Sequence, residues 1–241
     1  MDWTDRSTFL VELAQLLSPA PVRFSAKTMF MPQGSRAPDE ARLERFGPKW
    51  SHSTEPWSDL ESWWLKHTAG ANTPNWDIAV GCLIEDRPGL ILVEAKAHKR
   101  ELKVEGKRLD GRASSNSHEN HEHIGRAINE ACLGWQELDA SIEFSRDSHY
   151  QLANRLAFTW KLASFGFPVV LLYLGFIGDD GISNVGAPFD SDDDWQSVFF
   201  QYADGLVPLR MFDCRIEIAS SPVWLLSRSR PILEVSPRDS T

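Results

Sequence analysis

Two acidic residues and a lysine stand at the ends of two apolar segments, where they could together assist a hydrolysis. Asp77 directly precedes an apolar run, and Glu94 and Lys96 end the next one. Carboxylates and a backbone carbonyl are the hard oxygen ligands that Mg²⁺ takes, and a nearby ammonium group can orient or help ionise an attacking water. The three residues therefore predict Mg²⁺-assisted hydrolysis of a phosphate ester.

Two strands must position these residues. We expect a strand over 76–84, a tight turn over 85–89 and a strongly apolar strand over 90–97, together a hairpin. The turn length brings Asp77 and Glu94 into register. Side chains alternate along a strand, so Glu94 and Lys96 project from the same face. An acid and a lysine then share a face beside a second acid.

The remaining segments alternate between helical and strand patterns, which predicts one α/β domain over 1–241. Its core spans about 54–178, with an N-terminal helix over 5–17 and a C-terminal α/β extension over 179–241. The other expected elements are a loop over 32–48, helices over 54–68, 119–138, 150–165 and 194–202, strands over 168–177, 214–218 and 223–226, and an Asp-rich loop over 179–194.

Asp77 with Glu94-Ala95-Lys96 resembles the motif of the PD-(D/E)xK nuclease superfamily, which includes many restriction and repair enzymes. The resemblance covers about 57–177 and implies a restriction-endonuclease-like core, a mixed central β-sheet flanked by helices. It implies that Asp77, Glu94 and the main-chain carbonyl of Ala95 bind Mg²⁺, for which Mn²⁺ can substitute. It also implies that Lys96 assists the attacking water. Trp76 stands where the family motif has proline.

Three further residues are accessory candidates by the same resemblance. Glu61 lies one turn from two tryptophans on its helix and is the candidate for an extra acidic group at the metal site. Its alternative is a surface carboxylate. Gln151 and Arg155 stand four residues apart, and so on one helix face, where related nucleases place polar residues that meet the site or the phosphate backbone. Ordinary pairing on a helix surface is the alternative, and Arg155 stands where certain RecB-like families have tyrosine.

The charge is unevenly distributed along a chain whose formal net charge is −9. Residues 96–112 contain seven basic and three acidic side chains. A basic segment on an acidic body is typical either of a polyanion-binding surface or of a solvated face. The residues expected to contact nucleic acid are Lys99, Arg100, Lys103, Lys107, Arg108 and Arg112.

Composition excludes several other classes of protein. The longest apolar stretch, 165–177, is too short to cross a membrane, and the first residues lack the pattern of a secretory signal. The three cysteines have no CxxC spacing, which favours core residues in a reducing compartment. The histidines within 118–123 lack zinc-site spacing and favour a solvated helix start. We therefore expect a cytoplasmic protein with no membrane partner.

The leading hypothesis is a Mg²⁺-dependent nuclease acting on DNA, with RNA as the alternative substrate. The main rival is a non-catalytic nucleic-acid- or protein-binding module on the same fold, and the acidic total favours it slightly. The third hypothesis is a metal-dependent hydrolase that acts on a small phosphoester. A homodimer or a defence or repair complex is compatible with the first two.

Overall fold

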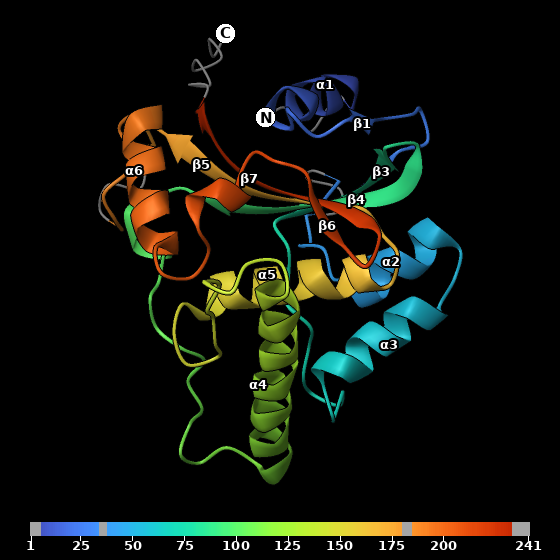
Figure 1. The fold of residues 1–241 in the computed structure, drawn as a ribbon, viewed down its shortest axis with the longest axis vertical. Coiled ribbons are helices and arrows are strands. Elements are labelled where there is room, and N and C mark those ends of the chain that lie inside the picture. Colours follow the sequence, from blue (N-terminus) through green and yellow to red (C-terminus); the bar gives the residue numbers. More distant parts are fainter. Residues whose placement is uncertain (1–5, 34–37, 180–184, 233–241) are drawn as a thin grey trace, which may run out of the picture.

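A curled, mixed β-sheet forms the centre of the computed structural model, which describes residues 6–33, 38–179 and 185–232. Helices flank this sheet, so the chain is an α/β protein (Figure 1). Within the described ranges the sheet has seven strands. In spatial order they are β1 (Val22–Arg23), β3 (Ile78–Ile84), β4 (Arg87–Lys96), β5 (Val169–Ile177), β7 (Ser221–Pro231) and β6 (Ile216–Ile218), with β2 (Met29–Met31) also paired to β3.

The expected hairpin is present as β3 and β4, and it is tighter than the pattern indicated. Ile84 pairs with Arg87, so the turn has two residues, Glu85 and Asp86, both with positive φ. That backbone conformation matches the twist of a two-residue hairpin. The register then pairs Ile78 with Val93 and brings the preceding residue, Asp77, level with Glu94.

The middle of the sheet is parallel. β4 pairs with β5, and β5 pairs with β7, both in parallel. Parallel strands need a crossover connection, and α4 and α5 supply the one from β4 to β5. These central strands are buried on both faces, which explains why they read as continuous apolar runs rather than as alternating ones.

Helices cover both faces of the sheet. Figure 1 shows α1 on one side of it, and α2 to α5 on the other. Each face of the sheet has its own apolar cluster. The larger cluster includes residues of α2 to α6, and the smaller one includes residues of α1. The helices are α1 (Arg6–Leu16), α2 (Leu43–Ser51), α3 (Glu55–Trp64), α4 (Ser115–Gln136), α5 (Tyr150–Ser164) and α6 (Asp192–Ala203), with single 3₁₀ turns at η2 (Lys99–Glu101) and η4 (Leu209–Met211).

Most of the expected elements are confirmed, with shifted ends. α4 begins four residues early because the Ser114 side chain caps it by accepting from the Ser117 amide. The Asp-rich loop is shorter than expected, since α6 already begins at Asp192, and the Ser191 side chain caps it. Parts of four expected segments lie outside the described residues: Asp5 and residues 34–37, 180–184 and 233–241.

The loop expected over 32–48 is wrong at its end, where α2 forms despite containing Pro48. Leu43 and Phe46 are spaced at i and i+3 and are fully buried, so packing of this face outweighs the proline penalty. The short strands β1 and β2 were not expected, because two or three residues carry no periodicity.

The expectation that the cysteines are core residues is confirmed for Cys82 and Cys132, which are buried, but not for Cys214, which is only partly buried. The cysteines are free, and six tryptophans are buried in the apolar clusters. In the described parts of the chain, no helix has the length and apolarity needed to cross a membrane.

Candidate functional site

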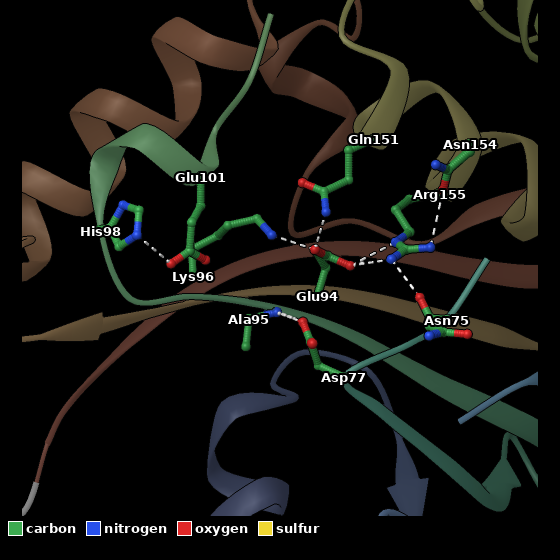
Figure 2. Close-up of polar contacts among 10 residues, drawn as sticks. All are labelled: Asn75, Asp77, Glu94, Ala95, Lys96, His98, Glu101, Gln151, Asn154 and Arg155. Atoms are coloured by element: carbon green, nitrogen blue, oxygen red, sulfur yellow. Dashed lines mark hydrogen bonds and ion pairs between the residues drawn. The ribbon is translucent and has the colours of Figure 1, made fainter. Parts of the chain in front are cut away.

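The Glu94 carboxylate is the centre of a buried polar cluster at the end of β4. Glu94 is 2% exposed, and both of its carboxylate oxygens accept hydrogen bonds from nitrogen donors. Oε1 accepts from Lys96 Nζ and from Gln151 Nε2 at 2.6 Å. Oε2 accepts from Arg155, whose Nε lies at 2.7 Å and whose Nη2 lies at 2.5 Å (Figure 2). Both predicted polar residues of the later helix therefore meet the strand that carries the acid–lysine pair.

Arg155 connects three elements at this point. Besides Glu94 on β4, its Nη2 donates to the carbonyl of Asn75 at 2.7 Å, just before β3. Its Nη1 donates to Asn154 Oδ1 at 3.1 Å, and its guanidinium lies over the Trp76 ring, 4.2 Å from the ring centroid. A planar guanidinium can satisfy several acceptors and stack at the same time, so Arg155 fixes the geometry of the cluster.

Asp77 approaches the same cluster from the start of β3. Its Oδ2 accepts from the amide of Ala95 at 2.6 Å (Figure 2). Burial, followed by repulsion from the Glu94 carboxylate, raises the pKa of Asp77 to about 6. The Ala95 amide and the charges of Lys96 and Arg155 oppose this rise. Asp77 is thus an acid whose charged form is poorly compensated where it sits.

Glu94 shows the opposite balance. Burial by itself would raise the pKa of Glu94, but the charges of Arg155 and Lys96 and their hydrogen bonds hold it below its usual value. Lys96 and Arg155 are only 4% and 5% exposed, so both cations depend on their carboxylate partners. With Asp77 and Glu94 ionised, the cluster contains two negative and two positive charges, but both cations contact Glu94 rather than Asp77.

The oxygen donors at this site fit Mg²⁺ by their chemistry. Asp77 uses only one carboxylate oxygen, and Oδ1 takes part in none of the hydrogen bonds between described residues. The Ala95 carbonyl and the Glu94 carboxylate supply further oxygens of the type that Mg²⁺ prefers. Glu94 would have to exchange a nitrogen partner to become a ligand. The described residues contain no ready-made cluster of three or more His, Cys, Asp or Glu side chains for a metal.

A cleft of about 640 Å³, which we call the basic cleft, opens beside Lys96. Lys103, Lys107 and Arg108 from the segment after β4 line it, together with Tyr150 and Gln151 from α5. Glu101 and Glu105 also line it, so four basic side chains face two acidic ones. Burial lowers the pKa of Lys107, whose ammonium lies 4.8 Å from the centre of the Tyr150 ring. The cleft has the cationic lining expected for a polyanion.

The other basic residues of the segment lie elsewhere. Lys99 forms an ion pair with Asp194 of α6 at 2.7 Å, and Arg100 donates to the Val185 carbonyl. Arg112 is exposed and does not line the basic cleft. These contacts attach the segment to the α6 side of the molecule, so the predicted set divides into residues inside and outside the basic cleft.

Glu61 is the accessory candidate that has no contact with the Glu94 cluster among the hydrogen bonds and ion pairs of the described residues. It is partly buried on α3, and in the described residues no hydrogen bond or ion pair joins its carboxylate to Asp77, Lys96 or Arg155. The apolar stripe of Trp57, Leu60 and Trp64 sets the orientation of α3. Glu61 flanks this stripe, and helical spacing alone could not tell towards which neighbour its carboxylate turns.

Three residues of the site were missed by sequence reasoning. Asn75 contributes a carbonyl to Arg155, Asn154 contributes an amide oxygen, and Tyr150 forms part of the cleft wall. A signal existed for Asn154, which lies three residues after Gln151 and so near it on the helix. The contribution of Asn75 could not be predicted from its residue type, because every residue has a backbone carbonyl.

Comparisons with protein-family models, curated proteins and solved structures gave no match to this chain. The function is therefore inferred from the site itself.

Proposed function

We propose that this protein is a cytoplasmic, Mg²⁺-dependent nuclease that hydrolyses phosphodiester bonds in DNA. The observation that carries the proposal is the contact of Glu94 with Lys96 on one face of β4, beside Asp77 and at the wall of the basic cleft. An acid, a lysine and a second acid at a cationic cleft form an arrangement suited to phosphoryl chemistry.

Each side chain has a distinct role in this proposal. Lys96 presents its ammonium at the cleft wall, where it orients the attacking water and offsets charge on the phosphate. Lys103, Lys107 and Arg108 hold the phosphate backbone in the basic cleft. Gln151 and Arg155 position the Glu94 carboxylate by occupying its two oxygens.

Asp77, Glu94 and the Ala95 carbonyl would hold the metal ion. Bound Mg²⁺ supplies Lewis-acid stabilisation of the phosphate and lowers the pKa of water. Burial, and then repulsion from Glu94, raises the pKa of Asp77, and the repulsion supports this assignment because a cation between the two carboxylates would relieve it. The ion would also give the charge-compensated cluster a net positive charge that attracts an anionic substrate.

The topology around the site also supports the proposal. A strand pair carrying first the aspartate and then the Glu-x-Lys sequence is followed by helices and a parallel strand, β5. This order is the one that the PD-(D/E)xK resemblance implies for its core. α5, the helix before β5, delivers Gln151 and Arg155 to the acid.

Cleavage assays with a matched lysine control test the proposal. Supercoiled plasmid, linear duplex, single-stranded DNA and RNA would be incubated with Mg²⁺ or Mn²⁺ and either wild-type protein, Lys96→Ala or Lys66→Ala. Lys66 also pairs with a glutamate, Glu119, but on the surface. Metal-dependent cleavage should be lost in Lys96→Ala and kept in Lys66→Ala. Equal cleavage by both folded variants would refute the role of Lys96.

A non-catalytic binding module is the second candidate, and the saturation of Glu94 by three nitrogen-bearing side chains favours it. In such a module the hydrogen bonds of the cluster would only hold α5 against the sheet. Calorimetry with Mn²⁺ separates the two candidates. Binding that is present in the wild type and lost in Asp77→Asn supports the nuclease, whereas no binding, or binding unchanged in the variant, supports the module.

A further inference from the structure

A second, smaller cavity adjoins the basic cleft. Its volume is about 310 Å³, and it shares Lys107, Tyr150 and Gln151 with the cleft as a common wall. Beyond this wall its lining changes from basic to amide-rich, with Asn72, Asn75, Asn154 and Arg155. We call it the amide pocket. A site for charged groups and a site for neutral polar groups thus lie next to each other.

The amide pocket has hydrogen-bonding capacity that the protein does not use. Asn154 is 4% exposed, and its Oδ1 accepts from Arg155, but its Nδ2 makes none of the hydrogen bonds between described residues. Gln151 donates through Nε2 to Glu94, and its Oε1 is likewise unused among those bonds. Figure 2 shows the Oε1 end of Gln151 turned away from Glu94, to which its Nε2 donates. Because both residues line the amide pocket, this unused donor and this unused acceptor are available there to the edge of a polar ligand.

Aromatic rings complete the pocket. Tyr150, which is only partly buried, forms part of the shared wall, and Trp64, which is 1% exposed, also lines the pocket but presents little of its ring. Aromatic surface beside amide donors and acceptors suits a planar ligand that stacks and hydrogen-bonds along its edge, as a nucleobase does. The volume lies at the lower end of the range for small-molecule sites, which fits one base.

We propose that the amide pocket binds an unstacked nucleobase of a single-stranded nucleic acid, while the adjoining phosphates lie in the basic cleft. This inference rests on the proposed function for the placement of phosphate beside Lys96. A base inside a duplex is paired along its edge and stacked on both faces, so the pocket selects single-stranded segments. In this arrangement the nucleotide crosses the shared wall of Lys107, Tyr150 and Gln151, with its base in the amide pocket and its phosphate in the basic cleft.

Binding to abasic DNA tests the pocket separately from catalysis. Fluorescence anisotropy in EDTA would compare a labelled single strand of about 12 nucleotides with an abasic strand of the same length. Both strands carry the same phosphates, so only the bases differ. The wild type should bind the intact strand about tenfold more tightly. Asn154→Ala should remove this preference.

Two further variants make the test robust. Asn72→Ala changes an exposed residue of the same pocket and should lower the preference several-fold without risk to the buried core. Asn129→Ala, an exposed asparagine on α4 away from both cavities, should keep the full preference.

The outcomes distinguish the two proposals. Equal wild-type affinity for intact and abasic strands, or no binding of either, overturns the nucleobase pocket. A preference that survives in both Asn154→Ala and Asn72→Ala also overturns it. Metal-dependent cleavage without a base preference therefore rejects the pocket and keeps the nuclease. A base preference lost in the variants, without cleavage, keeps the pocket and rejects the nuclease.

Discussion

Two guanidinium nitrogens of Arg155 contact the same oxygen of Glu94, Oε2, with Nε at 2.7 Å and Nη2 at 2.5 Å. The two side chains come from α5 and β4, sixty-one positions apart, and both are buried. This pair is the structural link between the helix that lines the basic cleft and the strand that carries the acid–lysine pair. We therefore expect substitutions of either residue to lower the stability of the fold as well as to alter the site.

Replacing Arg155 with methionine should lower the free energy of unfolding by about 3 to 5 kcal/mol, because Glu94 keeps its charge in a buried site with one cation removed. Arg155→Lys should recover part of this loss, since an ammonium restores the charge but not the geometry. Urea denaturation of both variants measures the difference. A matched change at Arg108, which is exposed, should alter stability by less than about 0.5 kcal/mol. Equal losses in all three variants would contradict the role of the pair.

The raised pKa of Asp77 predicts a pH-dependent gain of stability in Asp77→Asn. Below about pH 3.8 the carboxyl is protonated in both folded and unfolded chains, and the substitution changes little. Between that pH and about 6, only the unfolded chain ionises, so wild-type stability falls as pH rises. Above about 6 the variant should be more stable by about 1 to 3 kcal/mol. Urea denaturation across this range measures the difference, and a constant difference at every pH would contradict it.

Metal affinity should follow the same ionisation with the opposite sign. Protons compete with a cation for Asp77, so the affinity for Mn²⁺ should rise up to about pH 6 and level off above it. Calorimetry at several pH values measures this profile. In Asp77→Asn the residual binding should be weak and should lose the inflection. An inflection that persists in the variant would place the titrating group elsewhere.

The division of the basic segment predicts different salt dependence for its two parts. Lys103, Lys107 and Arg108 line the cleft, so replacing all three with alanine should reduce the slope of log K against log salt by about 2 to 3 for DNA binding. Replacing Lys99 and Arg100, which bond to Asp194 and Val185, should reduce it by less than about 1. Anisotropy titrations at several salt concentrations measure both slopes. Similar slopes for the two variants would contradict the placement of DNA in the basic cleft.

Two glycines of α4 should respond in opposite directions to alanine. Helix propensity alone favours alanine by about 1 kcal/mol at each position. A methyl group at Gly125 meets only the end of the flexible Arg146 side chain, 3.1 Å away, so stability should rise or stay equal. At Gly134 the methyl group would overlap the Trp160 indole, and stability should fall by about 1 to 3 kcal/mol. Thermal unfolding of the two variants decides between propensity and packing.

Local patterns were sufficient for the elements around the site. The apolar runs, the turn between them and the two-residue alternation of side chains placed Asp77 level with Glu94 and put Lys96 on the same face as Glu94. Helical spacing likewise placed Gln151 and Arg155 on one face of α5. These features depend on neighbours within one element or one hairpin, and such short-range geometry is encoded in residue order.

The sequence by itself therefore determined the α/β class, the hairpin and the pairing of an acid with a lysine at the end of β4. Only the tertiary structure decided that Arg155 and Gln151 saturate Glu94, that Glu61 makes no such contact, and that the basic segment divides between the cleft and the α6 side. Those outcomes depend on how α3, α5 and the segment after β4 pack on the sheet. Contacts between residues some sixty positions apart are fixed by the joint packing of several elements, which no single periodicity records.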